Sequence, residues 1–193
     1  MSSGALSFGP GDIAPTEPAD KVAAALARYR CVDATTDPEF DVAYRLLDAQ
    51  FGPVNELERR DVLERWFHLG TLSPPDDPIQ AHYHLLTVYD RDGRVAAVRD
   101  GFSAVDAGSG RVVELMSHSL VLPEWRRTGV AALLRAAPVV YARRRAPPGG
   151  EISVVAEMEM LEPDQPDTLI RLLAYRRSGF RILPPTVVAY AQP

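Results

Sequence analysis

The sequence predicts an α/β protein with a mixed, mostly antiparallel sheet flanked by helices. Up to about residue 80 the apolar residues recur at helical spacing, and from His82 onward the pattern changes to strand-like runs. Residues 111–157 then read as a strand, a helix and a second strand, an order that places the two strands parallel. We therefore expect helices in the first half and hairpins with one parallel strand in the second.

The chain begins with a segment that resembles a linker more than a packed element. Glycine and proline are frequent in residues 1–20, which predicts a flexible leader. The rest, residues 21–193, has the length and the 46% hydrophobic content of a single domain. Within it, a short helix is expected over residues 21–29 and a first strand over residues 30–34.

Two further helices are expected before the sheet. One starts at Asp37 and stops at Gly52-Pro53, because its large apolar residues fall on one face: Phe40, Tyr44, Leu47 and Phe51. Asn55, with Glu58 three residues later, predicts the N-cap of the next helix, which runs to Gly70.

The sheet is expected to have six or seven strands, and the second half is expected to supply six of them together with two helices. Turn residues separate the first three strands, so these are antiparallel hairpins. Pro138 falls inside the first helix and predicts a kink or an early end near Ala137, because proline lacks the backbone N–H of a helical bond. The expected strands are 82–89, 94–105, 111–122, 151–157, 181–183 and 186–190, and the expected helices are 127–145 and 168–178.

Composition excludes several classes of function. The formal net charge is −5, whereas a nucleic-acid-binding domain normally carries a basic excess. We expect no membrane span, since no apolar stretch reaches about 18 residues, and the N-terminus does not resemble a secretory signal. Cys31 is the only cysteine, so an internal disulfide is impossible and a cytoplasmic location is expected.

The segment from Val121 to Arg135 is suited to bind an anion. An apolar run ends at Pro123, and the sequence R-x-x-G-x-A from Arg126 to Ala131 opens a helix. The first N–H groups of a helix have no partner inside it, and the aligned peptide dipoles place about half a positive charge there. Gly129 lets a ligand approach the backbone closely, so we expect a phosphate group at this turn.

These residues resemble the acyl-CoA loop of the GNAT superfamily of N-acyltransferases, written Q/R-x-x-G-x-G/A and preceded by V-x-P-x-x, here Val121–Trp125. A second match lies in residues 172–183, where Tyr175 stands four residues before Gly179-Phe180. The resemblance covers the chain well from about residue 80 onward. It implies a GNAT-type sheet, acetyl-CoA as co-substrate, a helical acceptor-side half over residues 21–80 and an acyl-CoA-binding half over residues 81–193.

The resemblance also implies roles for individual residues. Tyr175 would be the acid that protonates the departing thiolate, since family members with this spacing place the phenol near the sulfur. Thr168 stands where the family often has an asparagine that holds the pantetheine amide, a departure that puts this contact in question. The residues expected to contact the donor are Leu120, Val121, Leu122, Arg126, Arg127, Thr128, Gly129, Val130, Ala131 and Thr168.

The general base is left open among three residues of the third hairpin strand. Glu114 and His118 share one face of a regular strand and Ser117 lies on the other. Family members often take their base from this strand, but a bulge is common there and would exchange the faces. Ser117 could polarise a water molecule, and His118 could accept a proton near neutral pH. The non-catalytic alternatives are a Glu114 solvated on the outer face and a His118 hydrogen-bonded in a core.

The sequence therefore predicts an N-acetyltransferase that moves an acetyl group from acetyl-CoA to a primary amine by direct attack in a ternary complex. The expected partners are acyl-CoA and a small amine substrate, with no nucleic acid, no membrane and no metal. A homodimer is left open. The alternatives are a non-catalytic CoA-binding or protein-interaction module on the same fold, and an acyltransferase for longer chains.

Overall fold

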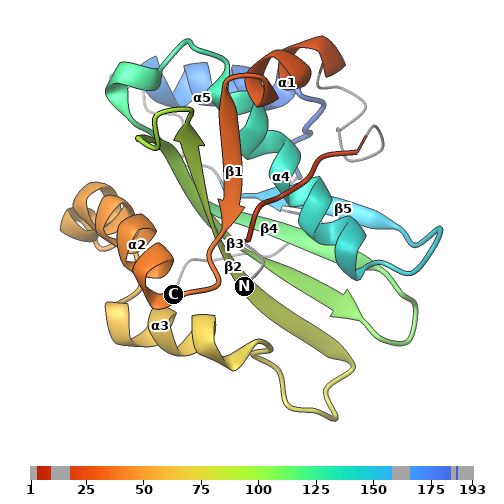
Figure 1. The fold of residues 1–193 in the computed structure, drawn as a ribbon. Helices are drawn as coiled ribbons and strands as arrows, with labels where there is room; N and C mark the ends of the chain where they lie inside the picture. Colours follow the sequence, from red (N-terminus) through yellow and green to blue (C-terminus); the bar gives the residue numbers. More distant parts are fainter. Residues whose placement is uncertain (1–3, 10–17, 158–165, 184–185, 187–193) are drawn as a thin grey trace. The chain divides into compact units, whose positions relative to one another are not determined.

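The computed structural model describes residues 4–9, 18–157, 166–183 and 186 (Figure 1). It divides the chain into two compact units, Met1–Glu157 and Met158–Pro193, and each is described by itself. The larger unit carries the sheet. The expected division into a leader and one domain stays a prediction.

Five strands in the described part of the chain form one sheet in the order β1-β2-β3-β4-β5. The first three junctions are antiparallel and the last, between β4 and β5, is parallel. This confirms the predicted mixed, mostly antiparallel sheet. The strands are β1 Tyr29–Asp33, β2 Ile79–Asp90, β3 Val95–Asp106, β4 Val112–Val121 and β5 Ile152–Ala156.

Helices cover both faces of this sheet (Figure 1). One core joins α1 and α4 to one face through residues such as Val22, Leu133 and Leu86. The other core joins α2 and α3 to the opposite face through Phe40 and Leu63. The helices of the larger unit are α1 Ala19–Leu26, α2 Asp37–Phe51, α3 Arg60–Leu69 and α4 Val130–Arg145, with short 3₁₀ turns η1 Gly52–Val54 and η2 Pro123–Trp125.

Asn55 is not the N-cap of the following helix, so this prediction is wrong. It has φ of 57° and closes η1 by donating its N–H to the Gly52 carbonyl at 3.1 Å. Asparagine tolerates this left-handed conformation better than most residues, which suits it to end a turn. The following helix, α3, starts at Arg60 instead.

Part of the expected leader is packed. Ala5 forms an antiparallel bridge with Val32 of β1, and Leu6 is buried in the core beneath α4. Gly4 lies so close to the Asp33 carbonyl that a Cβ would be 2.0 Å from its oxygen. Glycine at this position lets the segment approach the edge of the sheet, a close backbone contact that its composition did not reveal.

The smaller unit contains α5, Pro166–Arg177. The helix ends at Gly179, which has φ of 84°, and Phe180 donates its N–H to the Tyr175 carbonyl at 3.1 Å. Residues 181–183 are not a strand, contrary to the prediction, because this glycine turn is followed by irregular backbone. The strand expected at 186–190 lies outside the described residues apart from Thr186, which is in a turn.

Helix α4 continues through Pro138 to Arg145, so of the two expected outcomes, a kink or an early end near Ala137, the early end is wrong. Proline cannot donate to the carbonyl four residues earlier, here that of Leu134. The buried guanidinium of Arg99, on β3, donates to this carbonyl instead. Because a side chain replaces the missing donor, the helix tolerates the proline.

We predict that Arg99→Met lowers the free energy of unfolding by about 1–3 kcal/mol, since it leaves a buried carbonyl without this donor. In a Pro138→Ala background the restored N–H competes for the same carbonyl, so the cost should be smaller. Urea unfolding of the four proteins in this double-mutant cycle measures the difference. An equal cost in both backgrounds would contradict the account.

Candidate active site

The turn between β4 and α4 has the backbone of an anion-binding loop. After η2 the chain passes through Arg127, with φ of 64°, and Gly129, with φ of 93°. The Thr128 hydroxyl donates to the Trp125 carbonyl at 2.6 Å and fixes the turn. A Cβ on Gly129 would meet no atom within 4 Å, so this side of the loop is open space.

Four residues of this loop have backbone N–H groups without a hydrogen-bond partner in the described part of the chain. Among the described residues, no hydrogen bond engages the N–H groups of Arg127, Gly129, Val130 or Ala131. Ala132 is the first to bond, to the Gly129 carbonyl at 3.0 Å. Open N–H groups at a helix N-terminus, together with the positive end of the helix dipole, favour a negatively charged ligand.

The neighbouring strands separate just before this loop. β5 pairs with β4 from Val112–Ile152 to Met116–Ala156, and β4 then continues alone on that side to Val121. In the described residues, the β4 edge from Ser117 to Val121 therefore has backbone groups without a strand partner. An open strand edge that leads to an anion-binding turn offers both amide hydrogen bonds and a phosphate site to one extended ligand.

A bulge in β4 exchanges the faces of the strand, as the alternative in the sequence interpretation allowed. The pairing with β3 passes from Gly101–Met116 to Arg99–Ser119, so that Ser117 and His118 stand opposite Asp100 alone. Glu114 and Met116 are buried before the bulge and Leu120 after it. Leu120 belongs to the core beneath α2 and α3, whereas Glu114 contacts residues on the α4 face.

His118 sits on the α2 side of the bulge between two acceptors. Its backbone N–H and its Nδ1 lie 2.8 Å and 2.9 Å from Asp100 Oδ1, and its Nε2 lies 2.7 Å from the Glu56 carbonyl oxygen. The Phe51 ring packs against the imidazole, with 4.9 Å between the two ring centroids. Since a carboxylate and a carbonyl can only accept, both ring nitrogens are suited to carry protons.

The environment of His118 favours its charged form. Burial acts against the charge, but the hydrogen bond and charge of Asp100, with the contacts to Glu56, outweigh it and raise the pKa of His118. The Tyr83 hydroxyl donates to the second oxygen of Asp100 at 3.2 Å, and burial, then the charge of Asp100, raises the pKa of Tyr83. His118, Asp100 and Tyr83 thus form one network beside the bulge.

Glu114 is enclosed on the other face of the sheet. Its side chain is 0% exposed, accepts a hydrogen bond from Ser103 and lies against His84 Nε2. The His84 ring stacks on Tyr141 of α4 at 3.8 Å. A base must reach the proton it removes, and this carboxylate is surrounded by protein.

The structure does not bring all the candidates to one place. Ser117 is half-buried at the bulge beside His118. Leu120 is buried, and Leu122 donates its N–H to the Ala96 carbonyl at 3.1 Å. Tyr175 and Thr168 lie in α5, seven residues apart on one side of the helix, in the smaller unit. Their roles stay predictions.

Sequence reasoning missed Asp100. The signal was present in Arg99-Asp100, two charged residues in the middle of an apolar strand, where each must be paired to be buried. No group of three or more His, Cys, Asp or Glu side chains with metal-binding spacing occurs in residues 4–9, 18–157, 166–183 and 186. None of the described helices is long and apolar enough to cross a membrane.

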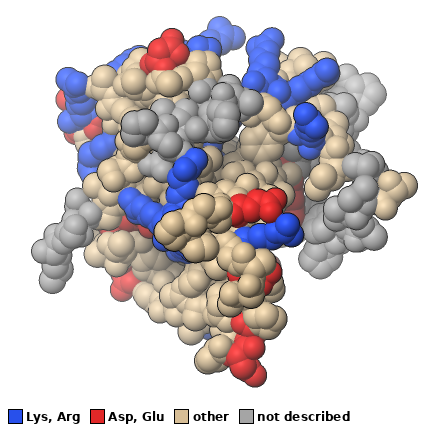
Figure 2. Space-filling view, turned by 90° about the vertical axis from the view of Figure 1, so that its right-hand side faces the viewer, with Lys and Arg blue, Asp and Glu red and all other residues tan. Residues whose placement is uncertain are grey.

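Charges of both signs are interspersed on the face of the molecule shown in Figure 2, where uncharged residues occupy most of the coloured surface. Such charges pair locally, as Arg111 and Glu151 do at 2.9 Å where β4 and β5 begin. Exposed pairs of this kind contribute little to stability, about 0–1 kcal/mol.

Comparison with solved structures identifies the fold. A probable acetyltransferase is 18% identical, with a TM-score of 0.59 over 85% of this chain and 97% of its own. An aminoglycoside acetyltransferase from an uncultured soil metagenomic sample, in complex with trehalose, is 13% identical, with a TM-score of 0.55 over 81% of this chain and 93% of its own. No protein-family profile matches the chain, and no curated protein matches it in sequence.

A second aminoglycoside acetyltransferase from an uncultured soil metagenomic sample has a TM-score of 0.53 and 14% identity over 86% of this chain and 97% of its own. The protein has the fold of the GNAT-type acetyltransferases. This confirms the fold expected from the two motifs. At these identities the likeness concerns the fold, and activity has to be argued from the site.

We predict that His118 makes stability depend on pH. Its pKa is raised in the folded state, so its contribution is complete below the unfolded value of about 6.5 and is lost as pH rises through the folded value. His118→Gln should therefore lower the free energy of unfolding more at pH 6 than at pH 9, by about 1 kcal/mol. Denaturant unfolding at both pH values measures this.

His68→Gln is the matched control, because His68 also faces a carboxylate, that of Asp37 at 2.7 Å, but both side chains are more than half exposed. Its effect should be small at either pH. Equal losses for His118→Gln at pH 6 and pH 9 would mean that the imidazole is not charged in the folded protein.

Proposed function

We propose that this protein is an N-acetyltransferase that uses acetyl-CoA. One observation carries the proposal: the edge of β4 from Ser117 to Val121 leads directly to the N–H groups of Gly129, Val130 and Ala131, and within the described residues neither has a partner. CoA has the matching sequence of groups, an arm with two amides followed by a diphosphate. The donor would lie along β4 with its diphosphate at the α4 N-terminus.

The acceptor is proposed to be a primary amine. Solved proteins with this fold include aminoglycoside acetyltransferases, which is support for an amine acceptor and not for a particular one. The side of the bulge that faces α2, where His118 and Phe51 lie, is the proposed acceptor side. We propose acetyl-CoA as the donor, because the neighbours with this fold are named acetyltransferases.

Direct attack by the amine is favoured over a covalent acyl-enzyme. The only cysteine, Cys31, is 2% exposed in the core beneath α4, and burial raises its pKa to about 12. A thiol in this state is neither accessible nor ionised, so it is unsuited to be a nucleophile. The amine nitrogen would bond to the thioester carbon as the carbon–sulfur bond breaks.

Two protons have to move in this reaction. We propose that Tyr175 gives its hydroxyl proton to the departing thiolate. For the proton lost by the amine, His118 is proposed ahead of Glu114, because Glu114 is enclosed whereas His118 is 20% exposed at the bulge. Only the neutral imidazole can accept a proton, so His118 first has to lose its Nε2 proton to solvent and release the Glu56 carbonyl. Ser117 would orient a water molecule between the His118 imidazole and the amine.

The same geometry is compatible with a module that binds CoA without turning it over, and with transfer of a longer acyl chain. Incubation with acetyl-CoA or longer acyl-CoA and a panel of amines, followed by measurement of free thiol, separates these alternatives. The cytoplasm is the proposed location, since a lone cysteine suits a reducing compartment. We expect no nucleic-acid or membrane partner.

We predict that Gly129→Glu abolishes acetyl-CoA binding, because its carboxylate would occupy the space next to the open N–H groups and repel the diphosphate. Gly129→Ala is the matched control. Both variants carry the strain of φ at 93°, about 1–2 kcal/mol, but only one adds charge. Calorimetry should find binding lost in the glutamate variant and weakened little in the alanine variant. Equal affinities would contradict the donor site.

We predict that Tyr175→Phe reduces turnover by about 10²–10⁴-fold if its hydroxyl protonates the thiolate. The ring, which packs edge-on against Phe180 at 5.0 Å, is retained, so stability and donor affinity should hold. Free-thiol release measures turnover and calorimetry measures donor binding. Full activity in the folded variant would remove Tyr175 from the mechanism.

A further inference from the structure

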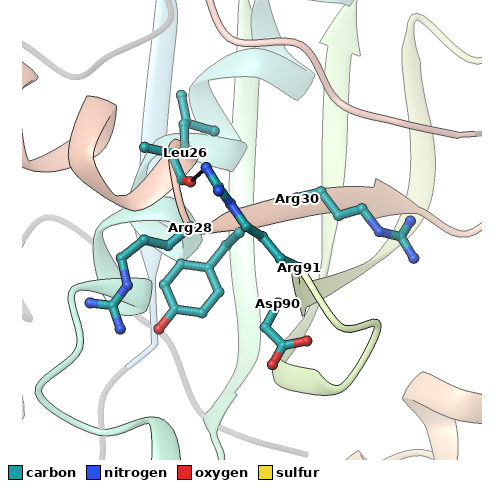
Figure 3. A pocket seen from close by; sticks show the side chains of 7 residues that line it. Leu26, Arg28, Arg30, Asp90 and Arg91 are labelled. Atoms are coloured by element: carbon teal, nitrogen blue, oxygen red, sulfur yellow. Dashed lines mark hydrogen bonds between the residues drawn. The ribbon is translucent and has the colours of Figure 1, made fainter.

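We propose that a second pocket, next to the α4 loop, binds a phosphate monoester through Arg28 and Arg91. The pocket has a volume of about 380 Å³. Its walls are the start of β1, the hairpin between β2 and β3, and Trp125 of η2. Figure 3 shows a smaller pocket that shares Arg28 and Arg91 with it; there Arg91 reaches the chain around Leu26 from the hairpin, and Arg28, just before β1, points to the other side of that chain. The proposal goes beyond the acetyltransferase function.

The carboxylates that line the pocket already have partners. Asp90 accepts from the N–H groups of Asp92 and Arg94, at 2.9 Å and 2.8 Å, and from the Arg94 guanidinium at 2.9 Å. Asp92 lies 3.5 Å from the same guanidinium. Hydrogen bonds of this kind lower the pKa of Asp90 although burial opposes them. Arg94 is thereby matched by carboxylates and contributes little net charge to the pocket.

Arg28 and Arg91 have no carboxylate partner among the residues that the structure describes. Each donates instead to a main-chain carbonyl: Arg28 Nη1 to Thr128 at 3.3 Å, and Arg91 to Ala27. A guanidinium has five N–H donors, so one such bond leaves most of them for a ligand. Arg30 does not join the pair, because it points away from Arg28 and lies over Tyr89 at 4.4 Å.

These contacts favour a doubly charged oxyanion. Two guanidiniums supply two positive charges, which match a phosphate monoester with about −1.5 to −2 at neutral pH better than a carboxylate. The carbonyl bonds, and the stacking of Arg28 over Tyr29 at 5.5 Å, hold the donors before the ligand arrives. Ordering a long side chain in advance lowers the entropy lost on binding.

The phosphate monoester has two sources of the same chemistry. Arg28 contacts the carbonyl of Thr128, the residue before Gly129, so the pocket adjoins the proposed donor loop. The 3′-phosphate of a bound CoA is one source. A separate phosphorylated small molecule is the other source. Its binding would change the conformation of the donor loop through the Arg28–Thr128 contact.

The test is a titration of the ¹⁵N-labelled full chain with inorganic phosphate, followed by NMR at the arginine Nε–H and backbone N–H signals. We expect the Nε–H signals of Arg28 and Arg91 to shift together along one binding curve. This curve should disappear in Arg28→Gln/Arg91→Gln and persist in Arg45→Gln. Arg45 is the matched control, since it also donates to a carbonyl, that of Asp41 at 3.1 Å, but outside the pocket.

Shifts confined to the N–H signals of Gly129, Val130 and Ala131 would overturn the proposal while leaving the donor loop intact. No shift at Arg28 or Arg91 at any phosphate concentration would overturn it as well. The wild-type titration decides this without a variant. Arg28→Lys/Arg91→Lys, which keeps both charges but loses the planar fork, should bind phosphate more weakly than the wild type and more tightly than the glutamine pair.

Calorimetry with CoA and dephospho-CoA separates the two sources. If the donor supplies the phosphate, the wild type should prefer CoA by about 10-fold, or about 1.4 kcal/mol, and the glutamine pair should lose this preference. If a separate molecule supplies it, the two donors should bind equally and the phosphate curve should persist with CoA bound. Either result supports the pocket. Failure of acetyl transfer affects neither measurement.

Discussion

The bulge in β4 is the constraint on which the rest of the candidate site depends. By placing Ser117 and His118 opposite the single residue Asp100, it interrupts the regular pairing with β3 at the point where the pairing with β5 stops. The strand then continues with its other face toward α2, and its open edge leads to the α4 turn. Asp100 holds this irregular backbone by accepting the His118 N–H at 2.8 Å, so one buried carboxylate determines the local geometry.

Three consecutive residues of β3 support the bulge in different ways. Arg99 faces α4 and satisfies the carbonyl that Pro138 leaves open. Asp100 faces the opposite side and holds His118. Gly101 permits the close approach of β4, because a Cβ there would lie 2.4 Å from the Leu115 carbonyl oxygen and 3.0 Å from the His84 ring. The α4 helix and the bulge are therefore coupled through adjacent residues of one strand.

The sequence was sufficient for the fold class and the α4 turn because these depend on local patterns. Alternation identified the strands, and R-x-x-G-x-A identified the open N–H groups. It was insufficient where a distant partner decides the outcome. Pro138 predicted a kink or an early end of the helix because its substitute donor, Arg99, is 39 positions away in the chain. Glu114 resembled an accessible base because a single-strand pattern cannot include His84, Ser103 and the covering α4.

The two networks that flank the bulge differ in what they can do. On the α4 side, His84 stacks on Tyr141, whose hydroxyl donates to Asp33 at 2.9 Å, and Glu114 is enclosed beneath them. A polar group buried in this way serves packing, since neither substrate nor solvent reaches it. On the α2 side, His118 is partly exposed and meets a carbonyl of the segment that links α2 and α3. An acceptor that displaces the Glu56 carbonyl from His118 would contact the imidazole directly, which is why the α2 side is the one proposed for the acceptor.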